Sequence, residues 1–524
     1  MVDPIAVTSG PELIIGLVGP VGTDLAIVKQ ALERVLETFH YDVRLVRLSN
    51  LIHQVDKFAH LAEEKFQTEG HRIRKYINAG TELREIAARG DLLALLSISE
   101  IRTIRERVNE TNKEIVDSDR ADIPLPRTAF LLSSLKHPDE IETLRAVYGK
   151  ACLIISAYST RDDRVEALAA RIAKSTHQFS DTPHRSMAEE LICTDEDEAG
   201  KPLGQSVSDA FPLADLFVDV REEHDVERQV ARFLEIFFGN SFHTPTRDEF
   251  GMFHARSAAL RSADLARQVG AVIAEKDGGI VAVGCNDVPK AGGGLYWSDD
   301  EEDHRDYKLG FDSSSRYKRE ILSEIINRLS ESGWLSEEKG SQDVDLMVND
   351  MLDGDSKEIM RDAQIMNLLE YGRSVHAEMA ALTDAARRGI KVQGCTLFTT
   401  TFPCHLCARH IVSAGIMRVV YVEPYPKSMA KKLYRDSIVV DSRCEVGNFV
   451  SFEPFVGTAP RKYLELFEMR KRKTSNGELV AWERSEAEPR IKRYVLSYLL
   501  IEQQIVGEKL PELLRQKGLS LHQQ

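Results

Sequence analysis

The sequence is short of positive charge and has no long apolar runs. Its 68 Lys and Arg residues are outnumbered by 83 Asp and Glu residues, which gives a net charge of −15. A long electrostatic footprint on nucleic acid requires Lys and Arg to neutralise phosphates, so this balance argues against one. No uninterrupted apolar stretch approaches the roughly 20 residues that a membrane helix needs. We therefore expect no membrane span.

The first residues also lack the features of a secretory signal. The segment MVDPIAVTSGPELII has neither a basic start nor an apolar core, so we expect a cytoplasmic protein. In that reducing compartment the seven cysteines are expected to be thiols rather than disulfides. Two of them, Cys404 and Cys407, form a C-x-x-C pair.

The length of 524 residues exceeds what one hydrophobic core normally supports, at roughly 150 residues per domain. An apolar run at 13–18, a glycine turn, a helical pattern and a second apolar run at 43–46 predict a β-loop-α-β opening. This order favours a parallel α/β sheet. We predict an α/β fold whose first domain covers residues 1–245.

Residues 246–444 are predicted to form a three-layer α/β/α domain. The pattern is a helix, a hairpin across residues 277–279, a helix near His376, a strand at 396–399, a helix near Cys404 and a strand at 419–422. The strongly charged stretch 298–370 has the character of an insertion. Residues 445–524 are expected to be a C-terminal extension; its basic cluster, 470–473, is either a solvated face or a contact for RNA or phosphate.

The segments His376-Ala377-Glu378 and Pro403-Cys404-His405-Leu406-Cys407 match the H-x-E…P-C-x-x-C pattern of zinc nucleobase deaminases. Three protein ligands leave the fourth zinc position open for water, whose pKa zinc lowers from 15.7 to about 7. We predict that His376, Cys404 and Cys407 bind zinc. Glu378 would be the catalytic acid–base that moves protons to N3 and to the leaving ammonia. A closed structural site is the alternative; it would need a fourth ligand such as Cys395.

Residues 250–426 resemble the deoxycytidylate deaminase family of the cytidine-deaminase-like superfamily. The matching text includes residues 268–273, 284–289, 375–378 and 400–404. The resemblance implies that Asn286 contacts the sugar or base of a deoxycytidine nucleotide, and we add Tyr425 as a second substrate contact. It also implies homo-oligomers, often hexamers, and regulation by dCTP or dTTP. Places that often hold cysteines for a second zinc hold Ala263 and Gly294, so one zinc per chain is expected.

The glycine turn near the start resembles a P-loop, with Gly19, Gly22 and Thr23 as its degenerate phosphate-binding residues. A complete P-loop reads G-x-x-x-x-G-K-[ST]. Counted from Gly19, the last three positions hold Asp24, Leu25 and Ala26, so the lysine and the hydroxyl are missing. We expect either an inactive P-loop-like domain or a turn that only packs strand against helix, and no kinase activity.

Taken whole, the chain resembles the bacterial anti-phage dCTP/dCMP deaminases, which combine a P-loop-like domain with a deoxycytidylate deaminase. The resemblance implies conversion of dCTP and dCMP to uridine forms, which depletes the nucleotide pool during infection. It also implies, for some members, silencing by a small RNA.

Three other functions compete with this interpretation. A housekeeping dCMP deaminase that supplies dUMP would use the same site, but that task needs only the small enzyme. An RNA or single-stranded DNA cytidine deaminase fits the −15 charge poorly. An RNA-binding regulator with a dead deaminase is opposed by the intact Glu378.

Overall fold

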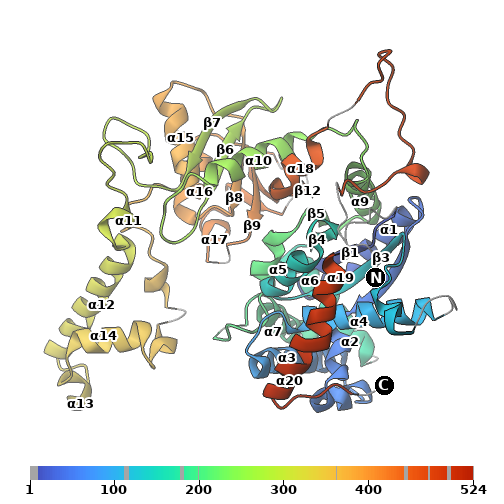
Figure 1. Ribbon diagram of the computed structural model, residues 1–524. Helices are drawn as coiled ribbons and strands as arrows, with labels where there is room; N and C mark the ends of the chain where they lie inside the picture. Colours follow the sequence, from blue (N-terminus) through green and yellow to red (C-terminus); the bar gives the residue numbers. More distant parts are fainter. Residues whose placement is uncertain are drawn as a thin grey trace. The chain divides into compact units, whose positions relative to one another are not determined.

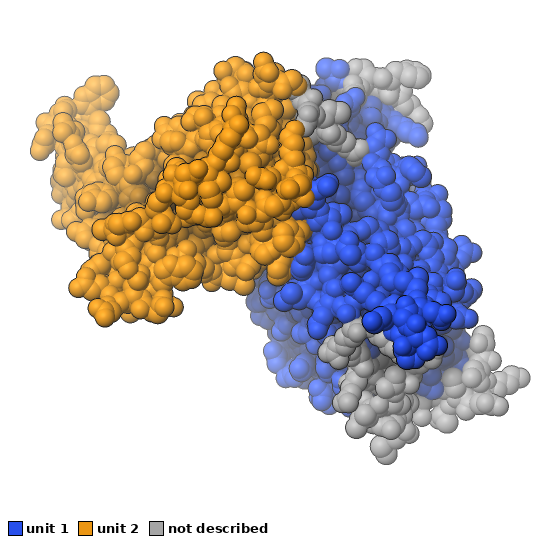
Figure 2. Space-filling view, turned by 90° about the horizontal axis from the view of Figure 1, so that it is seen from above, with its two compact units in different colours: residues 1–249, 456–524 blue, residues 250–455 orange. Residues whose placement is uncertain are grey.

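The computed structural model describes residues 10–110, 117–176, 182–198, 200–360, 363–425, 427–441, 447–469, 472–491 and 497–522. The chain divides into two compact units (Figure 2). Unit 1 holds residues 1–249 and 456–524, and unit 2 holds residues 250–455. Unit 2 is thus inserted between two segments of unit 1. This division differs from the expected order 1–245, 246–444 and 445–524, because residues 456–524 group with unit 1.

Unit 1 is built on a six-stranded sheet with the order β12-β5-β4-β1-β3-β2 (Figure 1). Its strands are β1 (Leu13–Val18), β2 (Asp42–Arg47), β3 (Thr128–Leu135), β4 (Cys152–Tyr158), β5 (Leu216–Asp219) and β12 (Gly457–Thr458). Strands β1 to β5 are parallel, and β12 pairs antiparallel with β5. The parallel α/β fold predicted from the first strands is confirmed.

The helices of unit 1 include amphipathic segments with buried stripes. They are α1 (Leu25–Glu37), α2 (Leu48–Leu51), α3 (Glu69–Ala87), α4 (Leu92–Asn109), α5 (Pro138–Tyr148), α6 (Arg161–Ser175), α7 (Arg185–Glu196), α8 (Val207–Ala210), α9 (Glu223–Phe237), α18 (Tyr463–Phe467), α19 (Ser497–Gln504) and α20 (Leu510–Gln516). In α1, for example, Val28, Leu32 and Val35 are buried in the main core. Within the described ranges, no helix is long and apolar enough to cross a membrane.

A buried charge cluster holds the C-terminal segment in unit 1. The guanidinium of Arg105 on α4 donates to both carboxylate oxygens of Glu12, at 2.9 Å each, and to Oε1 of Glu502 on α19, at 3.0 Å. The hydroxyl of Tyr498 donates to Glu12, and that of Tyr148 donates to Glu502. Arg105 and Glu502 are fully buried and Glu12 nearly so, which joins segments almost 500 residues apart in sequence.

Unit 2 contains a second six-stranded sheet with the order β10-β11-β9-β8-β6-β7. Its strands are β6 (Gly270–Ala274), β7 (Ile280–Cys285), β8 (Thr396–Thr401), β9 (Arg418–Glu423), β10 (Ile438–Val440) and β11 (Val450–Pro454). The predicted hairpin is confirmed as antiparallel β6 and β7. Strand β8 runs antiparallel to β6 and parallel to β9.

Helices of unit 2 fall into a sheet-covering group and an inserted group. The first group is α10 (Arg247–Ala259), α15 (Ala377–Arg387), α16 (His405–Ser413) and α17 (Ala430–Leu433); α10 begins within unit 1. The second group is α11 (Asp306–Leu309), α12 (Ser313–Glu331), α13 (Glu337–Gly340) and α14 (Val344–Asp353). The inserted group has a small apolar core of its own, which includes Leu322, Ile326 and Val348.

The buried cluster around Arg105 predicts a large loss of stability in Arg105→Ala. Two carboxylates would then face each other in the core without a counter-charge, and breaking such a buried pair costs about 3–5 kcal/mol. The matched control is Arg74→Ala, which removes an exposed ion pair with Glu190 in the same unit and should cost less than about 1 kcal/mol. Urea denaturation followed by circular dichroism measures both values. Equal losses in the two variants would contradict a clamping role for Arg105.

Candidate active site

The candidate ligands lie where two helices of unit 2 begin. His376 is the N-cap residue of α15, and Cys404 is the N-cap residue of α16, three residues after the end of β8. The Cys404 sulfur accepts a hydrogen bond from the backbone N–H of Cys407, which caps the first turn of α16. Helix N-termini favour negative charge, so this position suits thiolates.

Close packing fixes the start of α15 against the sheet. A Cβ atom at Gly284 in β7 would lie 2.3 Å from the carbonyl oxygen of Ala377, so only glycine allows the helix to come this near. Immediately beyond β7, Asp287 forms two backbone hydrogen bonds with Val375, the residue before His376. The loop after β7 and the start of α15 are therefore held together.

The three predicted ligands converge. Nδ1 of His376 lies 3.2 Å from Sγ of Cys404 and 3.4 Å from Sγ of Cys407, and all three ligand atoms lie within 4.8 Å of one another. Tetrahedral zinc with ordinary Zn–S and Zn–N bonds separates such atoms by about 3.5 Å. Within the described ranges, no other group of three or more His, Cys, Asp or Glu residues meets this distance. The donor set fits zinc.

The electrostatics of these groups favour a thiolate. Hydrogen bonds from Cys407 and His376 lower the pKa of Cys404 to about 4, against the effect of burial. The hydrogen bond to Cys404 raises the pKa of His376 to about 9. Zinc requires thiolates and a neutral imidazole, so its binding would displace protons from His376 and from Cys407, whose pKa is raised by the hydrogen bond to Cys404 and by burial.

Glu378 lies two residues beyond His376, on the first turn of α15, and only 4% of its surface is exposed. Burial, followed by the nearby Cys404, raises its pKa. A carboxyl group with a raised pKa beside a cavity is suited to both accept and return a proton.

A cavity of about 410 Å³ opens onto this centre. His376, Glu378 and Cys404 line it, as do the two predicted substrate contacts, Asn286 and Tyr425. This volume is within the range of small-molecule pockets. The structure therefore brings the predicted residues of unit 2 together around one cavity.

Asn286 holds the cavity wall through its side chain. Its Oδ1 accepts from the backbone N–H of Val269 at 2.7 Å, and its Nδ2 donates to the carbonyl of Arg267 at 2.8 Å. A carboxamide has two N–H donors, so one remains beyond the bond to Arg267. Tyr425 lies near the same segment, with its ring 5.7 Å from the Arg267 guanidinium.

Sequence reasoning missed the part of the wall that the insertion supplies. Ser314, Ser315 and Lys318 of α12 line the cavity, together with Asp306 and Arg373. Their signal was weak, because serines and charged residues in a charged stretch normally indicate a solvated surface. Only the fold brings them to His376.

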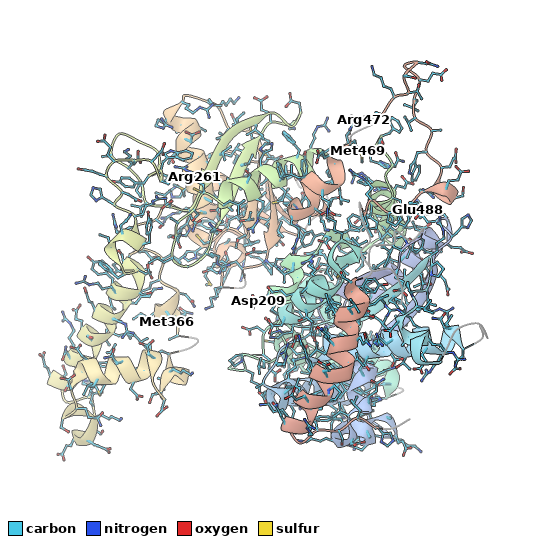
Figure 3. All side chains as sticks on the ribbon, in the orientation of Figure 1. Asp209, Arg261, Met366, Met469, Arg472 and Glu488 are labelled. Atoms are coloured by element: carbon cyan, nitrogen blue, oxygen red, sulfur yellow. The ribbon has the colours of Figure 1, made fainter. Side chains whose placement is uncertain are left out.

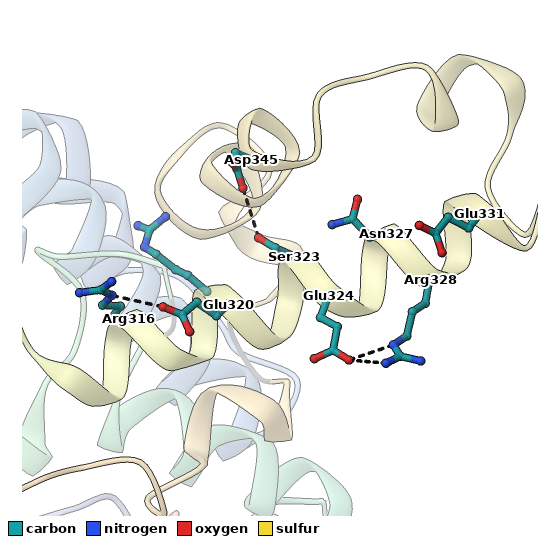
Figure 4. Close-up of a pocket in the computed structure, with 9 residues that line it drawn as sticks. Arg316, Glu320, Ser323, Glu324, Asn327, Arg328, Glu331 and Asp345 are labelled. Carbon is teal, nitrogen blue, oxygen red and sulfur yellow. Dashed lines mark hydrogen bonds and ion pairs between the residues drawn. The ribbon is translucent and has the colours of Figure 1, made fainter.

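A second hollow lies on the outer part of α12, with a volume of about 730 Å³ (Figure 4). Its charged residues pair mainly among themselves, as in Arg316–Glu320 and Glu324–Arg328. Exposed pairs of this kind are typical of a solvated helix surface. It shares no lining residue with the cavity at His376.

The glycine turn of unit 1 joins β1 to α1, as predicted, but the chain's own carboxylates occupy it. Asp195, which is fully buried, accepts a hydrogen bond from the backbone N–H of Val21 at 2.7 Å. Lys136 bridges Asp195 and the carbonyl of Gly19. At the start of α1, Asp24 accepts from the backbone N–H of Ala26.

Gly19, Gly22 and Thr23, the predicted residues of this turn, make contacts within the protein itself. Gly22 has a φ of +93°, and a Cβ atom there would lie 2.5 Å from the carbonyl oxygen of Arg164. Thr23 donates its backbone N–H to Pro20 in the tight turn. A phosphate at this turn would have to displace Asp195 from Val21.

Of the basic cluster 470–473, residues 470 and 471 lie outside the described part of the chain. Arg472, which Figure 3 labels, is solvent-exposed, and so is Lys473.

Comparison with known proteins shows which family the residues around the site are similar to. Residues 245–423 match the family model "Cytidine and deoxycytidylate deaminase zinc-binding region". The deoxycytidylate deaminase of Enterobacteria phage T2 is 39% identical over 74 residues, which is 14% of this chain and 38% of that protein. The "Probable deoxycytidylate deaminase" of Drosophila melanogaster is 26% identical over 230 residues, which is 42% of this chain and 85% of that protein.

Among solved structures, the dCMP deaminase of cyanophage S-TIM5 in complex with dCMP and dUMP is 18% identical. The match covers 41% of this chain and 100% of that one, with a TM-score of 0.22.

The chain spans less than two fifths of the phage T2 relative that it matches. Residues 245–423 match the zinc-binding region of cytidine and deoxycytidylate deaminases. With the convergent His376, Cys404 and Cys407 group, this match confirms zinc as the expected cofactor. The assignment of individual ligands stays a prediction.

We predict one zinc per chain and its loss in Cys404→Ala, because two remaining ligands cannot hold the ion tightly. The matched control is Cys395→Ala, a buried cysteine outside the ligand group that should keep one equivalent. Inductively coupled plasma mass spectrometry of the dialysed proteins gives the stoichiometry. Loss of zinc in the Cys395 variant would identify a closed four-ligand site instead.

We also predict no ATP turnover by unit 1, because Leu25 and Ala26 stand where a P-loop has lysine and a hydroxyl. Phosphate release from ATP measures this activity. ATP hydrolysis that disappears in Gly22→Ala would refute the prediction.

Asp195→Asn should lower the free energy of unfolding by about 1–3 kcal/mol, since Lys136 loses its counter-charge in a buried setting. Urea denaturation measures this loss.

Proposed function

We propose that the protein deaminates deoxycytidine nucleotides, dCMP or dCTP, by zinc-dependent hydrolysis to the deoxyuridine forms and ammonia. The observation that carries the proposal is the cavity in which His376 and Cys404 meet the buried carboxyl of Glu378. The family match of residues 245–423 supports deamination. The names of the relatives support a deoxycytidylate substrate.

His376, Cys404 and Cys407 would hold the zinc. When bound, zinc supplies a Lewis acid that makes water a nucleophile near neutral pH. Glu378 accepts the proton of that water and delivers it to N3 of the cytosine ring as C4 is attacked. The carboxylate then takes the remaining proton of that water, from the hydroxyl now on C4, and gives it to the amino group, so that the C4–N bond breaks, ammonia leaves and the C4 carbonyl forms. Its buried position keeps it beside the reacting ring and away from bulk solvent.

Substrate positioning falls to the walls of the cavity. The remaining N–H of the Asn286 amide is proposed to donate to the sugar or base of the nucleotide. Tyr425, half-buried on the same cavity, offers an aromatic face for the ring. Arg267 contacts both side chains. Its carbonyl accepts a hydrogen bond from Asn286, and its guanidinium lies 5.7 Å from the Tyr425 ring.

The wider role rests on the resemblance to bacterial anti-phage deaminases. We propose that a cytoplasmic enzyme of this kind depletes the deoxycytidine nucleotide pool during phage infection. Unit 1 would be a P-loop-like domain that has lost its phosphate site, as Asp195 at Val21 suggests. Homo-oligomers, a regulatory dCTP or dTTP and an inhibitory small RNA belong to the same proposal. A housekeeping supply of dUMP would use the same chemistry.

Glu378→Ala tests the chemistry. General acid–base catalysis contributes roughly 10²–10⁴-fold, and here one carboxyl serves successive proton transfers, so the rate loss should reach the top of that range. Zinc content and folding should be retained, because Glu378 is outside the ligand group. Ammonia release from dCMP and dCTP gives the rate, and metal analysis gives the zinc.

The control for this variant is Glu331→Ala, an exposed glutamate on α12 that should deaminate at the wild-type rate. Adenosine nucleotides serve as the substrate control and should release no ammonia. Near wild-type turnover in Glu378→Ala would show that another group moves the protons. Turnover of dATP without turnover of dCMP or dCTP would refute the proposed substrate class.

A further inference from the structure

The inserted helix α12 contributes directly to the catalytic cavity. Lys318 and the serines at its first turn line the same space as His376 and Glu378. Helix α12 is anchored at its other end in the small apolar core that it shares with α14. The insertion is thus a wall of the substrate cavity as well as an appended subdomain.

Lys318 is a partly buried cation with no anionic partner in the described part of the chain. Its ammonium donates to the carbonyl of Met366 at 2.9 Å, a residue labelled in Figure 3. Burial lowers its pKa, and the nearby Lys427 adds to that effect, whereas Asp312 and Glu370 oppose it from outside ion-pair distance. An ammonium that has lost part of its water gains from a charged partner.

The carboxylates on the same wall are already committed to other groups. Asp306 pairs with Arg373 at 2.7 Å. Asp312 caps α12 and accepts from the backbone N–H groups of Ser314 and Ser315. Neither carboxylate lies within ion-pair distance of Lys318, so its ammonium keeps N–H donors for a ligand beyond the bond to Met366.

Arg373 is a second cation on the cavity, three residues before His376. It is held by Asp306 and by the carbonyl of His304, which fixes the plane of its guanidinium. An arginine has five N–H donors, so others remain for a ligand beyond these two bonds. Its fork suits the oxygen atoms of a phosphate.

We propose that Lys318 is the phosphate-recognition residue of the substrate site, with Arg373 as its neighbour. The ligand class is the 5′-phosphate of a pyrimidine deoxynucleotide whose base lies at Glu378. The inference rests on the proposed function and deepens it: the insertion makes the enzyme selective for nucleotides over nucleosides. Lys318 acts as a specificity-determining group and takes no part in proton transfer.

The test compares substrates with and without phosphate in full-length protein. Lys318→Met keeps the aliphatic stem and removes the charge. Its kcat/KM for dCMP and dCTP should fall about 10- to 100-fold through KM, the range for a lost charge-assisted hydrogen bond. Its kcat/KM for deoxycytidine should stay at the wild-type value. Lys318→Arg should recover most of the loss, because it restores the charge.

The matched control is Arg328→Ala, which removes one positive charge from the same helix at an exposed ion pair with Glu324. It should leave all three substrates unaffected. Calorimetric titration of dCMP, dCTP and deoxycytidine into Glu378→Ala, with and without Lys318→Met, gives the same comparison for binding. This second measurement needs no turnover.

Three results would overturn the inference: equal losses for deoxycytidine and dCMP, no loss for either nucleotide, or equal losses in the Arg328 control. A wild-type protein that releases no ammonia from any cytosine substrate would refute the proposed function instead. If Lys318 contacts the first phosphate, both dCMP and dCTP lose affinity in Lys318→Met. A loss for dCTP alone would contradict that contact.

Discussion

The candidate active site depends on two helices whose N-termini lie next to each other. His376 and Cys404 are both N-cap residues, on α15 and α16, and their ligand atoms lie 3.2 Å apart. The arrangement places the positive ends of two helices around a group that becomes negatively charged, which stabilises the thiolates. Gly284 makes it possible, because any side chain there would push α15 away from β7.

In the proposed mechanism, the same helix start carries the metal ligand and the proton-transfer group. His376 lies at the N-cap and Glu378 lies in the first turn, so one backbone element sets the position of both groups. The pKa values of both groups are raised, but by different causes. The hydrogen bond to Cys404 raises the pKa of His376, whereas burial raises the pKa of Glu378. One element therefore places a proposed zinc ligand and a proposed acid–base group on the same cavity.

Internal charge pairing decides which parts of the molecule can accept an anion. In unit 1 the buried Asp195 occupies the backbone N–H of Val21 and is neutralised by Lys136, so the glycine turn is satisfied from within. In unit 2 the opposite holds for Lys318, whose described partner is a neutral carbonyl. An acidic protein can thus still offer a cation to a phosphate, because the groups that line one cavity matter more for a bound ligand than the total charge.

The sequence by itself determined the local elements and the chemistry of the centre. The hairpin at β6 and β7 follows from alternating apolar runs around a glycine turn, and the H-x-E and C-x-x-C spacings fix which side chains share a helix start. Short-range patterns of this kind are set by residues that are neighbours along the chain. Asn286 and Tyr425 came instead from resemblance and from no such pattern.

Only the tertiary structure decided what distant segments do. Residues 456–524 belong to unit 1 because Glu502 and Tyr498 meet Arg105 and Glu12 in its core, a pairing that no local pattern encodes. The glycine turn is closed by Asp195, about 170 residues away, and the cavity is walled by Lys318 from a segment that reads as a solvated insertion. For Arg105 and Asp195 the physical reason is the same: a buried charge is stable only beside a partner, and the fold alone selects that partner. Lys318 lines the cavity because the fold of the insertion brings α12 there.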